Sequence, residues 1–258
     1  MSFDSDLTAC AQLVERGDPD RFAATMAAPV GARKVLFPIY AFNVEVSRAP
    51  WVTQEVLIAE MRLQWWTDAL DEIASGGVVR RHEVVTSLAH VLDAEAANTL
   101  KNVVKARLWD VYRDPFEDQA AFSKYLEDTA GSLFLAAAQA LSGEMPKALK
   151  DLGFASGLAQ FLRAVPELER LGRIPLVDGR SDAVKALATD GLSRLADARR
   201  ARGAVPPVAR PVGLAAWQAG PILKQVQADP QRVANGTLGT AEAYKKGRLM
   251  WQAFTGRW

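Results

Sequence analysis

Hydrophobic residues recur along the chain at the spacing of α-helices. Apolar side chains three or four residues apart fall on one face of a helix, whereas a half-buried strand alternates every second residue. Four such stripes stand out: Val35, Ile39, Phe42 and Val46; Leu57, Met61, Trp65, Ala69 and Ile73; Leu126, Ala130, Leu133, Ala137 and Leu141; and Leu152, Ala155, Ala159, Leu162 and Val165. No β-branched segment alternates cleanly between turn signals, so the pattern predicts an all-α protein.

Glycine and proline clusters divide this pattern into roughly nine or ten predicted helices. Asp18 and Pro19 form an expected helix start, since Asp caps a helix and Pro suits its first position. The proline-rich stretch 201–213 is expected to be a surface connector before the last two helices, with a domain boundary as the alternative. Trp251 and Trp258 are expected to dock onto the protein body or a partner.

Composition narrows the classes of function. The 258 residues contain 31 Lys and Arg against 30 Asp and Glu, so no overall field recruits nucleic acid. Cys10 is the only cysteine, which excludes an intrachain disulfide and a cysteine-rich metal site. The acidic N-terminal stretch resembles neither a signal nor a transit peptide, and no run approaches the ~20 apolar residues of a spanning helix. We therefore expect a cytoplasmic protein that at most lies peripherally against the inner membrane.

Five sequence blocks occur in an order that carries a family resemblance. They are PVGARKVLFPIYAFNVEVSRAPW (from residue 29), EMRLQWWTDALDEI, KARLWDVYRDPFED, YLEDTAGSLFLAAAQALSG and GLAQFLRAVPELERLGRIPL. Together they resemble the squalene/phytoene synthase family, head-to-head prenyl transferases, most strongly over residues 20–180. The resemblance implies one domain over residues 1–258 with the all-α isoprenoid synthase fold and a central cavity. It also implies that the helices bearing Ser47 and Ala164 face each other across that cavity.

The first family signature is only partly present. Members typically read Y-A-F-C-R, two further residues, then D-D-x-x-D. This chain keeps Tyr40 and the two residues after it, and has Asn43 where Cys is usual. The aspartates would fall at Ser47, Arg48 and Trp51. The first group of acidic ligands is therefore missing.

The second signature, L-R-D-x-x-x-D, has lost its aspartates as well. Arg163 is kept, but the two acidic positions align with Ala164 and Leu168. The family's Y-C-Y-x-V-A-G block keeps Tyr125 and Gly131. The resemblance makes six residues candidates for lining the cavity or binding a ligand: Tyr40, Asn43, Tyr125, Gly131, Arg163 and Glu167.

The missing acids bear directly on the chemistry. Ionising a prenyl diphosphate requires magnesium ions to neutralise the leaving group, and carboxylates at i and i+4 hold those ions from one helix face. The active family would use Mg²⁺. Each helix face with its pair of carboxylates is called a clamp, and the loss of both clamps predicts no catalytic residue, no metal site and no cofactor here. Glu167 could contribute to a weak metal site, with a solvated or arginine-paired side chain as the alternative. Glu45 is expected to pair with Arg48.

Other polar and aromatic residues have simpler interpretations. Asp68, Asp71 and Glu72 are expected on a solvated helix face, and His82 and His90 on the surface.

Trp65 is expected to continue the buried stripe, and Trp66 to reach a second neighbour or the cavity. A contact of Trp66 with a partner or membrane is its alternative. The basic spot at 80–82 is expected to be a loop end, with contact to acidic lipid or a partner as the alternative.

The sequence supports three hypotheses. AFNVEV, M-R-L-Q-W-W and the missing aspartates resemble a degenerate branch of the family, similar to a phytoene-synthase-like mitochondrial assembly factor for NADH dehydrogenase (complex I). That resemblance implies a non-catalytic assembly or interaction factor whose partner is a respiratory-complex subunit, with no role for nucleic acid. The alternatives are an active prenyl transferase with a reorganised metal site, or a protein that binds an isoprenoid or lipid without turnover.

Overall fold

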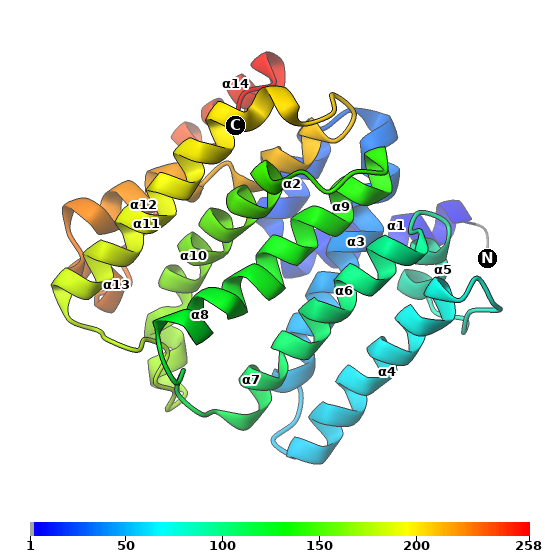
Figure 1. Cartoon of the computed structure of the whole chain (residues 1–258), viewed down its shortest axis with the longest axis horizontal. Coiled ribbons are helices and arrows are strands. Elements are labelled where there is room, and N and C mark those ends of the chain that lie inside the picture. The colour runs from blue at the N-terminus through cyan, green and yellow to red at the C-terminus, as the bar shows by residue number, and fades with distance from the viewer. Residues whose placement is uncertain (1–2) are drawn as a thin grey trace.

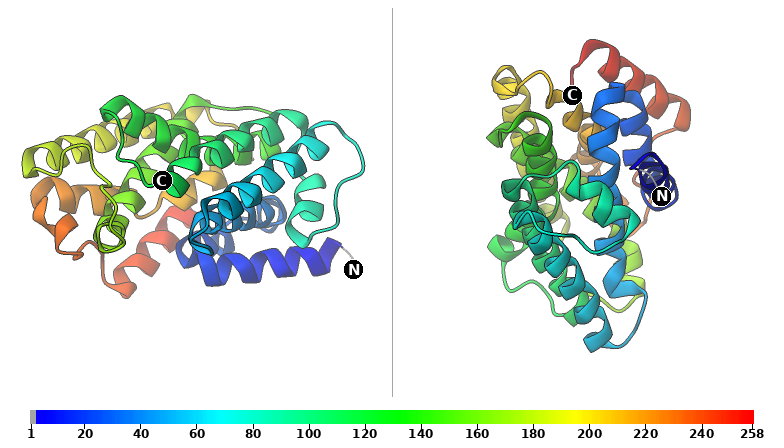
Figure 2. Two further views of the ribbon diagram at one scale, coloured as in Figure 1. Left: turned by 90° about the horizontal axis from the view of Figure 1, so that it is seen from below. Right: turned by 90° about the vertical axis from the view of Figure 1, so that its right-hand side faces the viewer.

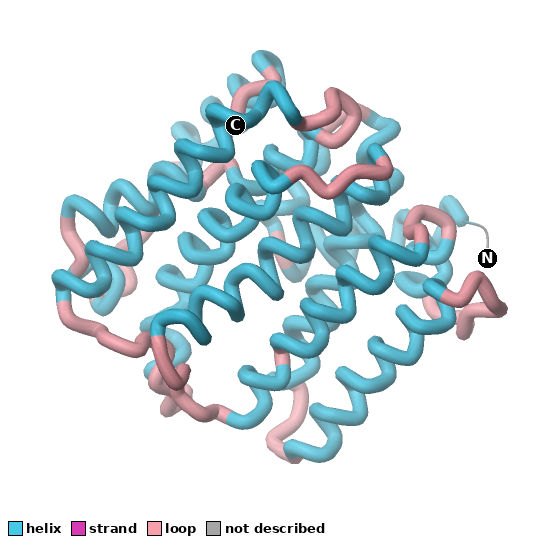
Figure 3. The backbone as a smooth tube through the Cα atoms, in the orientation of Figure 1, coloured by secondary structure: helices cyan, strands magenta, loops and turns pink. Residues whose placement is uncertain are grey.

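The computed structural model describes residues 3–258, and all regular structure in that range is helical (Figure 3). This confirms the predicted all-α class. The α-helices are α1 (Phe3–Gly17), α2 (Pro19–Ala27), α3 (Val30–Arg48), α4 (Val56–Ala74), α5 (Glu83–Ala89), α6 (Ala94–Ala106), α7 (Leu108–Tyr112), α8 (Gln119–Leu126), α9 (Ser132–Ser142), α10 (Lys147–Arg170), α11 (Ser181–Arg200), α12 (Ala219–Ala228), α13 (Gln231–Ala234) and α14 (Glu242–Thr255). Four short turns are η1 (Ala49–Trp51), η2 (Glu127–Gly131), η3 (Ala201–Ala204) and η4 (Arg210–Ala216).

The fourteen α-helices within residues 3–258 exceed the nine or ten predicted. The prediction was too low partly because α5, α7 and α13 span only 7, 5 and 4 residues. A hydrophobic period of 3.6 residues needs about three turns before it can be recognised, and these helices are shorter than that.

Local sequence explains where the helices around the cavity begin and end. Asp18 caps α2 by accepting the backbone N–H of Arg21 at 3.0 Å, with Pro19 in the first turn, as predicted. Helix α3 ends at Arg48, and Pro50 follows in η1. Proline has no N–H with which to continue the helical ladder. The chain therefore turns at the position where the family carries its first group of aspartates.

The helices form two layers around one core. Helices α4, α6, α9, α10 and α11 lie side by side in that order, with α3 behind them (Figure 1). Helix α3 also packs against α1, α2 and α5, which complete the second layer (Figure 2). Buried apolar residues from Cys10 to Trp258 form one connected cluster. This arrangement confirms the single-domain prediction.

Three of the four hydrophobic stripes are buried or half-buried as predicted, and the stripe on α4 is buried only in its second half. Leu57 and Met61 are 68% and 63% exposed. Besides Ala69 and Ile73 of the predicted stripe, helix α4 buries a second set of residues: Ala59, Leu63, Trp66 and Leu70. The helix carries apolar residues on two faces, and contact with α6 covers only one of them. Trp66, rather than Trp65, is therefore the more deeply buried tryptophan.

The C-terminal part of the chain packs onto the same body. Residues 201–213 lead through η3 into η4 and are followed by α12, α13 and α14, one helix more than predicted. The Trp258 ring packs against Gly213, where an added Cβ would lie 2.4 Å from the indole. Trp258 is 5% exposed, whereas Trp251 is 62% exposed. Across residues 3–258, no helix is long and apolar enough to cross a membrane.

Candidate functional site

A cavity of about 410 Å³ opens between α3, α7, α8, η2 and the C-terminal half of α10. Its lining includes Ser47 from α3 and Ala164 from α10, so the two helices that would carry the clamps face the same space, as expected. The remaining lining residues are Asp18, Arg21, Asn43, Trp51, Arg107, Asp110, Tyr125, Leu126, Thr129, Ala130, Gly157, Gln160, Phe161, Glu167, Leu168 and Leu171.

The clamp positions present a hydroxyl group and apolar surface to this cavity. The Ser47 hydroxyl donates a hydrogen bond to the Asn43 carbonyl in its own helix. Trp51, Ala164 and Leu168 contribute apolar wall. Arg48 lies outside the cavity lining and pairs with Glu45 at 3.3 Å, as predicted for that pair. Its positive charge therefore faces a separate groove along α4 rather than the cavity.

A buried polar cluster, the Asp110 triad, occupies one wall. Arg107 donates to the Asp110 carboxylate at 3.1 Å and to the Tyr125 hydroxyl at 2.7 Å, and Tyr125 donates to Asp110 at 3.0 Å. Burial raises the pKa of Tyr125, Arg107 opposes this, and Asp110 adds to it. Tyr125 therefore remains a neutral hydrogen-bond donor, and the Asp110 carboxylate is shared between an arginine and a phenol.

Arg173 supports the triad from outside. Its guanidinium donates to the carbonyls of Trp109 and Asp110 and lies 4.9 Å from the Trp51 ring centroid. Burial lowers its pKa and neighbouring Arg113 lowers it further, while Asp110 opposes both effects. Trp51, which replaces a family aspartate, thus stacks on a cation instead of coordinating one.

A second buried ion pair lies across the cavity. Arg21 pairs with Asp18 through its guanidinium and donates to the Gln160 amide oxygen at 3.3 Å. The same guanidinium lies 5.7 Å from the ring centroid of Tyr40. Both arginines that line the cavity, Arg21 and Arg107, therefore already have acidic partners.

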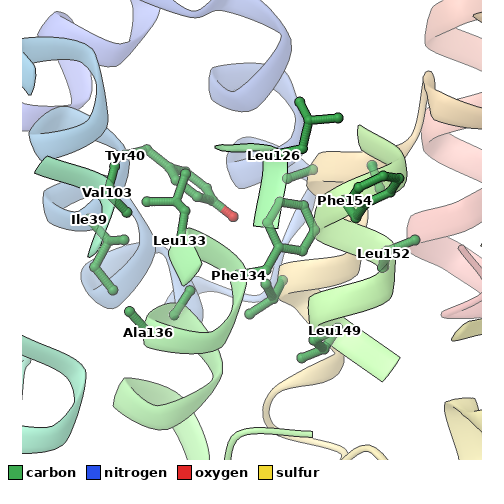
Figure 4. Close-up of a cluster of buried hydrophobic side chains, with 14 of the residues drawn as sticks. Ile39, Tyr40, Val103, Leu126, Leu133, Phe134, Ala136, Leu149, Leu152 and Phe154 are labelled. Carbon is green, nitrogen blue, oxygen red and sulfur yellow. The ribbon is translucent and has the colours of Figure 1, made fainter. Parts of the chain in front are cut away.

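Three of the six residues predicted to line the cavity lie elsewhere. Tyr40 is buried beside Ile39, Val103 and Leu133 in the hydrophobic core (Figure 4). Its hydroxyl has no hydrogen-bond partner among the described residues, and burial raises its pKa. Tyr40 was a candidate because it matches the family signature, but its side chain is buried in the core.

Gly131 and Arg163 are the other two residues that do not line this cavity. Gly131 packs against α10, where an added Cβ would lie 3.4 Å from Lys150, and its neighbours Thr129 and Ala130 line the cavity instead. Arg163 pairs with Asp20 at 3.1 Å beside a small separate pocket. Both positions are one residue from a lining position, which on a helix turns the side chain by ~100°.

Asn43, Tyr125 and Glu167 do line the cavity, and their role in ligand binding stays a prediction. Glu167 is exposed at the rim and accepts hydrogen bonds from Arg170 at 2.6 and 2.8 Å. These bonds hold its pKa below the usual value. The arginine-paired alternative therefore describes Glu167 better than the metal-ligand alternative.

The close approach of α10 to η2 shapes the back of the cavity. The turn η2 is π-helical and joins α8 to α9 in one continuous rod (Figure 1). A Cβ on Gly153 would lie 2.6 Å from the Ala130 carbonyl oxygen, and one on Gly157 would lie 2.6 Å from the Ala130 Cβ. Only glycine allows this contact without a shift of backbone. π-Helical turns are often found at functional sites.

Sequence reasoning missed several lining residues, among them four polar side chains and one aromatic ring: Asp18, Arg21, Arg107, Gln160 and Phe161. The i,i+3 spacing of Asp18 with Arg21 and of Arg107 with Asp110 is a visible signal of pairing. Nothing in the spacing indicates that these pairs are buried, because burial depends on α10 packing over them.

The donor set does not fit the magnesium cluster of the active family. In the described part of the chain, no group of three or more His, Cys, Asp or Glu side chains is arranged to hold a metal ion. The cavity acids Asp18, Asp110 and Glu167 each pair with an arginine. A magnesium ion would have to displace a guanidinium from each of them, so these acids do not fit a metal cluster.

The three acidic residues near the end of α4 each have a polar partner. Glu72 accepts hydrogen bonds from Arg80, Asp71 pairs with Lys101, and Asp68 accepts from Gln64 at 2.7 Å.

His82 caps α5 by accepting the Val84 N–H at 3.2 Å, and its ring lies 5.3 Å from Trp65 and 5.5 Å from Trp66. This histidine therefore has a structural position in the groove along α4.

Comparison with known proteins places the chain among prenyl synthases by fold. The squalene/phytoene synthase family model matches residues 14–177. A dehydrosqualene synthase crystal structure superimposes with a TM-score of 0.80 at 15% identity, covering 98% of this chain and 96% of that one. Squalene synthase HpnC from Alicyclobacillus acidocaldarius gives 0.74 at 14% identity, covering 89% and 95%. At such identities the likeness shows the fold alone.

Two curated relatives have names of a different kind. A Drosophila melanogaster protein named "NADH dehydrogenase (ubiquinone) complex I, assembly factor 6 homolog" is 27% identical over 283 residues, covering 96% of this chain and 83% of that protein. The Bos taurus protein named "NADH dehydrogenase (ubiquinone) complex I, assembly factor 6" is 23% identical over 172 residues, covering 61% of this chain and 48% of that protein.

Proposed function

The chain belongs to the squalene/phytoene synthase family, and we propose that it is a non-catalytic member that acts as an assembly factor for respiratory complex I (NADH dehydrogenase). The observation that carries the proposal is a family cavity without its acidic clamps. Ser47, Trp51, Ala164 and Leu168 stand at the clamp positions, and the remaining cavity acids are held by arginines. The names of the insect and bovine relatives support the assembly role.

The chemistry argues against the transferase alternative. Head-to-head condensation requires that a diphosphate leave, and this needs metal ions held by several carboxylates. A reorganised site would have to recruit Asp18, Asp110 or Glu167 away from their guanidinium partners. We therefore expect no squalene, phytoene or cyclopropyl intermediate from purified protein, Mg²⁺ and farnesyl or geranylgeranyl diphosphate. Product above a heat-killed control would make the transferase hypothesis the better one.

Binding of an isoprenoid or lipid without turnover is a second candidate, favoured by the wall of the cavity. The cavity of about 410 Å³ has apolar side chains in its lining, among them Trp51, Phe161, Ala164 and Leu168. At ~25 cal/mol per Å² of apolar area, burying even half of a prenyl chain there would favour binding by several kcal/mol. Titration with a quinone carrying a short prenyl tail tests this, with Ala164→Asp as the variant that places a charge in the wall.

The proposed partner is a protein subunit of the respiratory complex, and the proposed location is cytoplasmic, at the face of the inner membrane. Large apolar side chains are exposed on two separate surfaces, one at the start of α4 and one on α14. Contiguous exposed apolar patches are typical of surfaces that contact a protein or a membrane. These surfaces support an interaction role more directly than any group in the cavity does.

Gene deletion in the host tests the assembly proposal. We expect deletion to lower the amount of assembled complex I on native gels and its NADH oxidation activity, and wild-type protein to restore both. Ser47→Ala, which removes the last polar group at a clamp position, should restore them equally well because no clamp chemistry is required. Unchanged complex I in the deletion strain would contradict the proposal. Failure of Ser47→Ala alone would point to chemistry in the cavity.

A further inference from the structure

Helix α14 exposes an apolar face to solvent. Tyr244, Met250, Trp251 and Phe254 are 54%, 71%, 62% and 90% exposed. At 100° per residue these four side chains fall within about one third of the helix circumference, and we call them the α14 face. Leu249 and Gln252, on the opposite side, are buried. A surface helix normally turns its polar side toward solvent, so an exposed apolar face of this kind is typical of a surface that contacts another molecule.

A basic groove of about 360 Å³ lies beside the α14 face. It runs between the end of α14 and residues 202–214, and Phe254 lines both surfaces. Arg202 and Arg210 line it as well, and no Asp or Glu is among its described lining residues. The pKa of Arg202 is lowered by burial and then by repulsion from Arg210 and Arg257. Three cations are thus close enough to disfavour one another.

One hydrogen-bond donor in the wall of the groove is unsatisfied. The Arg202 Nε–H is buried and has no partner among the described residues. The nearest acids along the chain are already engaged, since Asp197 pairs with Arg200 and Glu242 pairs with Lys245. The groove therefore carries arginine side chains without an acidic partner among its described lining residues, which is the chemistry that recognises a phosphate group.

The position of α14 favours a flat partner over a grooved one. Its main contacts are with α2 and η4, and it lies at the edge of the molecule in both views of Figure 2. The α14 face therefore lies on the outside of the molecule. A helix at the edge with exposed aromatic side chains and nearby cations suits a planar lipid surface, where Trp and Phe enter the headgroup boundary and arginine meets lipid phosphate.

We infer that the α14 face and the basic groove bind this protein to the surface of a membrane rich in anionic lipid. Trp251, Phe254 and Met250 enter the interface while Arg202 and Arg210 bind headgroup phosphates. The inference deepens the inner-membrane location proposed above and rests on the proposed function in that respect. It concerns the lipid contact alone, and it is measured with no assembly partner present.

The apolar surface at the start of α4 provides a matched comparison. Leu57 and Met61 are 68% and 63% exposed, similar to the residues of the α14 face. Arg48 beside them is paired with Glu45, and Glu60 lies on the same helix. This surface offers the same hydrophobicity without the excess of cations. The inference therefore predicts that the two surfaces differ in their attraction to anionic lipid.

Co-sedimentation of the full chain with vesicles tests the inference. The vesicles contain phosphatidylglycerol and phosphatidylcholine in equal parts, or phosphatidylcholine alone. We expect binding to the mixed vesicles that weakens as salt is raised, and much weaker binding to phosphatidylcholine. Arg202→Gln with Arg210→Gln should lower the affinity about 25-fold, at about fivefold for each cation near an anionic surface. Trp251→Ser with Phe254→Ser should lower it at least tenfold.

The control pair is Leu57→Ser with Met61→Ser, which should leave vesicle binding unchanged. All substituted residues of both apolar pairs are exposed, so circular dichroism should show folded protein in each case. The inference is overturned if wild-type protein does not bind the mixed vesicles, in which case the α14 face is left for a protein partner. It is also overturned if the control pair weakens binding as much as the α14 pair. Neither result depends on the level of complex I in a deletion strain, so the two proposals fail separately.

Discussion

Replacing Asp110 by Asn removes one charge from the buried triad and leaves its shape intact. Asp110 is 4% exposed, and the Arg107 side chain beside it is 18% exposed. Asn keeps an oxygen that can accept from Arg107 or from Tyr125. The guanidinium, however, loses its counter-ion in a region that water barely reaches. We expect Asp110→Asn to destabilise the folded protein strongly.

The magnitude follows from the geometry. At an N–O separation of 3.1 Å, two unit charges attract by about 5 kcal/mol at an effective dielectric of 20. Part of that attraction is offset, since a neutral amide costs less to bury than a carboxylate. Breaking a buried pair from one side typically costs about 3–5 kcal/mol. We therefore expect a loss of about 3 kcal/mol and a fall in Tm of roughly 6–12 °C for a chain of this size.

Urea and thermal unfolding followed by circular dichroism measure this loss, with Asp71→Asn as the control. Asp71 makes the same kind of ion pair with Lys101, but its side chain is 56% exposed. The control should cost less than about 1 kcal/mol. A double-mutant cycle with Tyr125→Phe should give a coupling energy of about 1 kcal/mol or more, because Tyr125 donates to the same carboxylate. If Asp110→Asn costs no more than Asp71→Asn, the argument from burial is refuted.

Three further predictions concern the binding of Mg²⁺, the loss of the Glu127 contribution to stability in acid, and the reactivity of the Cys10 thiol. Calorimetry should detect no micromolar Mg²⁺ binding, and micromolar binding abolished by Glu167→Ala would show that a clamp survives in altered form. Burial alone would raise the pKa of Glu127, but hydrogen bonds from Arg194 and Lys150 lower it below 4.5 overall. Its contribution to stability is therefore present above pH 4.5 and is lost at lower pH. Glu127→Gln should cost roughly 1–2 kcal/mol in urea unfolding at neutral pH, and a cost that persists unchanged in acid would contradict the assignment. Burial raises the pKa of Cys10 to about 11 from 9.0, so native protein should resist iodoacetamide at pH 8 while unfolded protein reacts, and stability should fall as pH rises from 9 towards 11.

The sequence predicted those features that repeat along the chain or align with a family signature. The stripes on α3, on α8–α9 and on α10 lie in helices that are buried on most sides along much of their length, so the structure buries these stripes as expected. The positions of Ser47 and Ala164 on facing walls followed from the order of the motif blocks. On α4 the prediction failed, because Leu57 and Trp66 lie on different apolar faces and only packing against α6 decides between them.

The polar part of the cavity was not predictable from spacing. The Asp110 triad joins Arg107 and Asp110 to Tyr125, which follows fifteen residues later on another helix. Arg21 meets Gln160 across 139 residues of sequence. Such contacts depend on how helices pack, and a single sequence has no period that reports them. The one-residue errors at Gly131 and Arg163 have the same origin, because a side chain's direction on a helix changes by ~100° per residue.

The π-helical turn η2 separates the side chains that line the cavity from those that form the core. It holds one residue more than an α-helical turn would, so α8 and α9 continue in one direction with separate side-chain registers. Tyr125 and Leu126, before the turn, face the cavity, whereas Leu133 and Phe134, after it, are fully buried in the core. Substitutions on the cavity side therefore need not rotate the residues that hold the two layers together. A fold built in this way can lose the reactive groups of its cavity over evolutionary time and still keep the packing that makes it a stable scaffold.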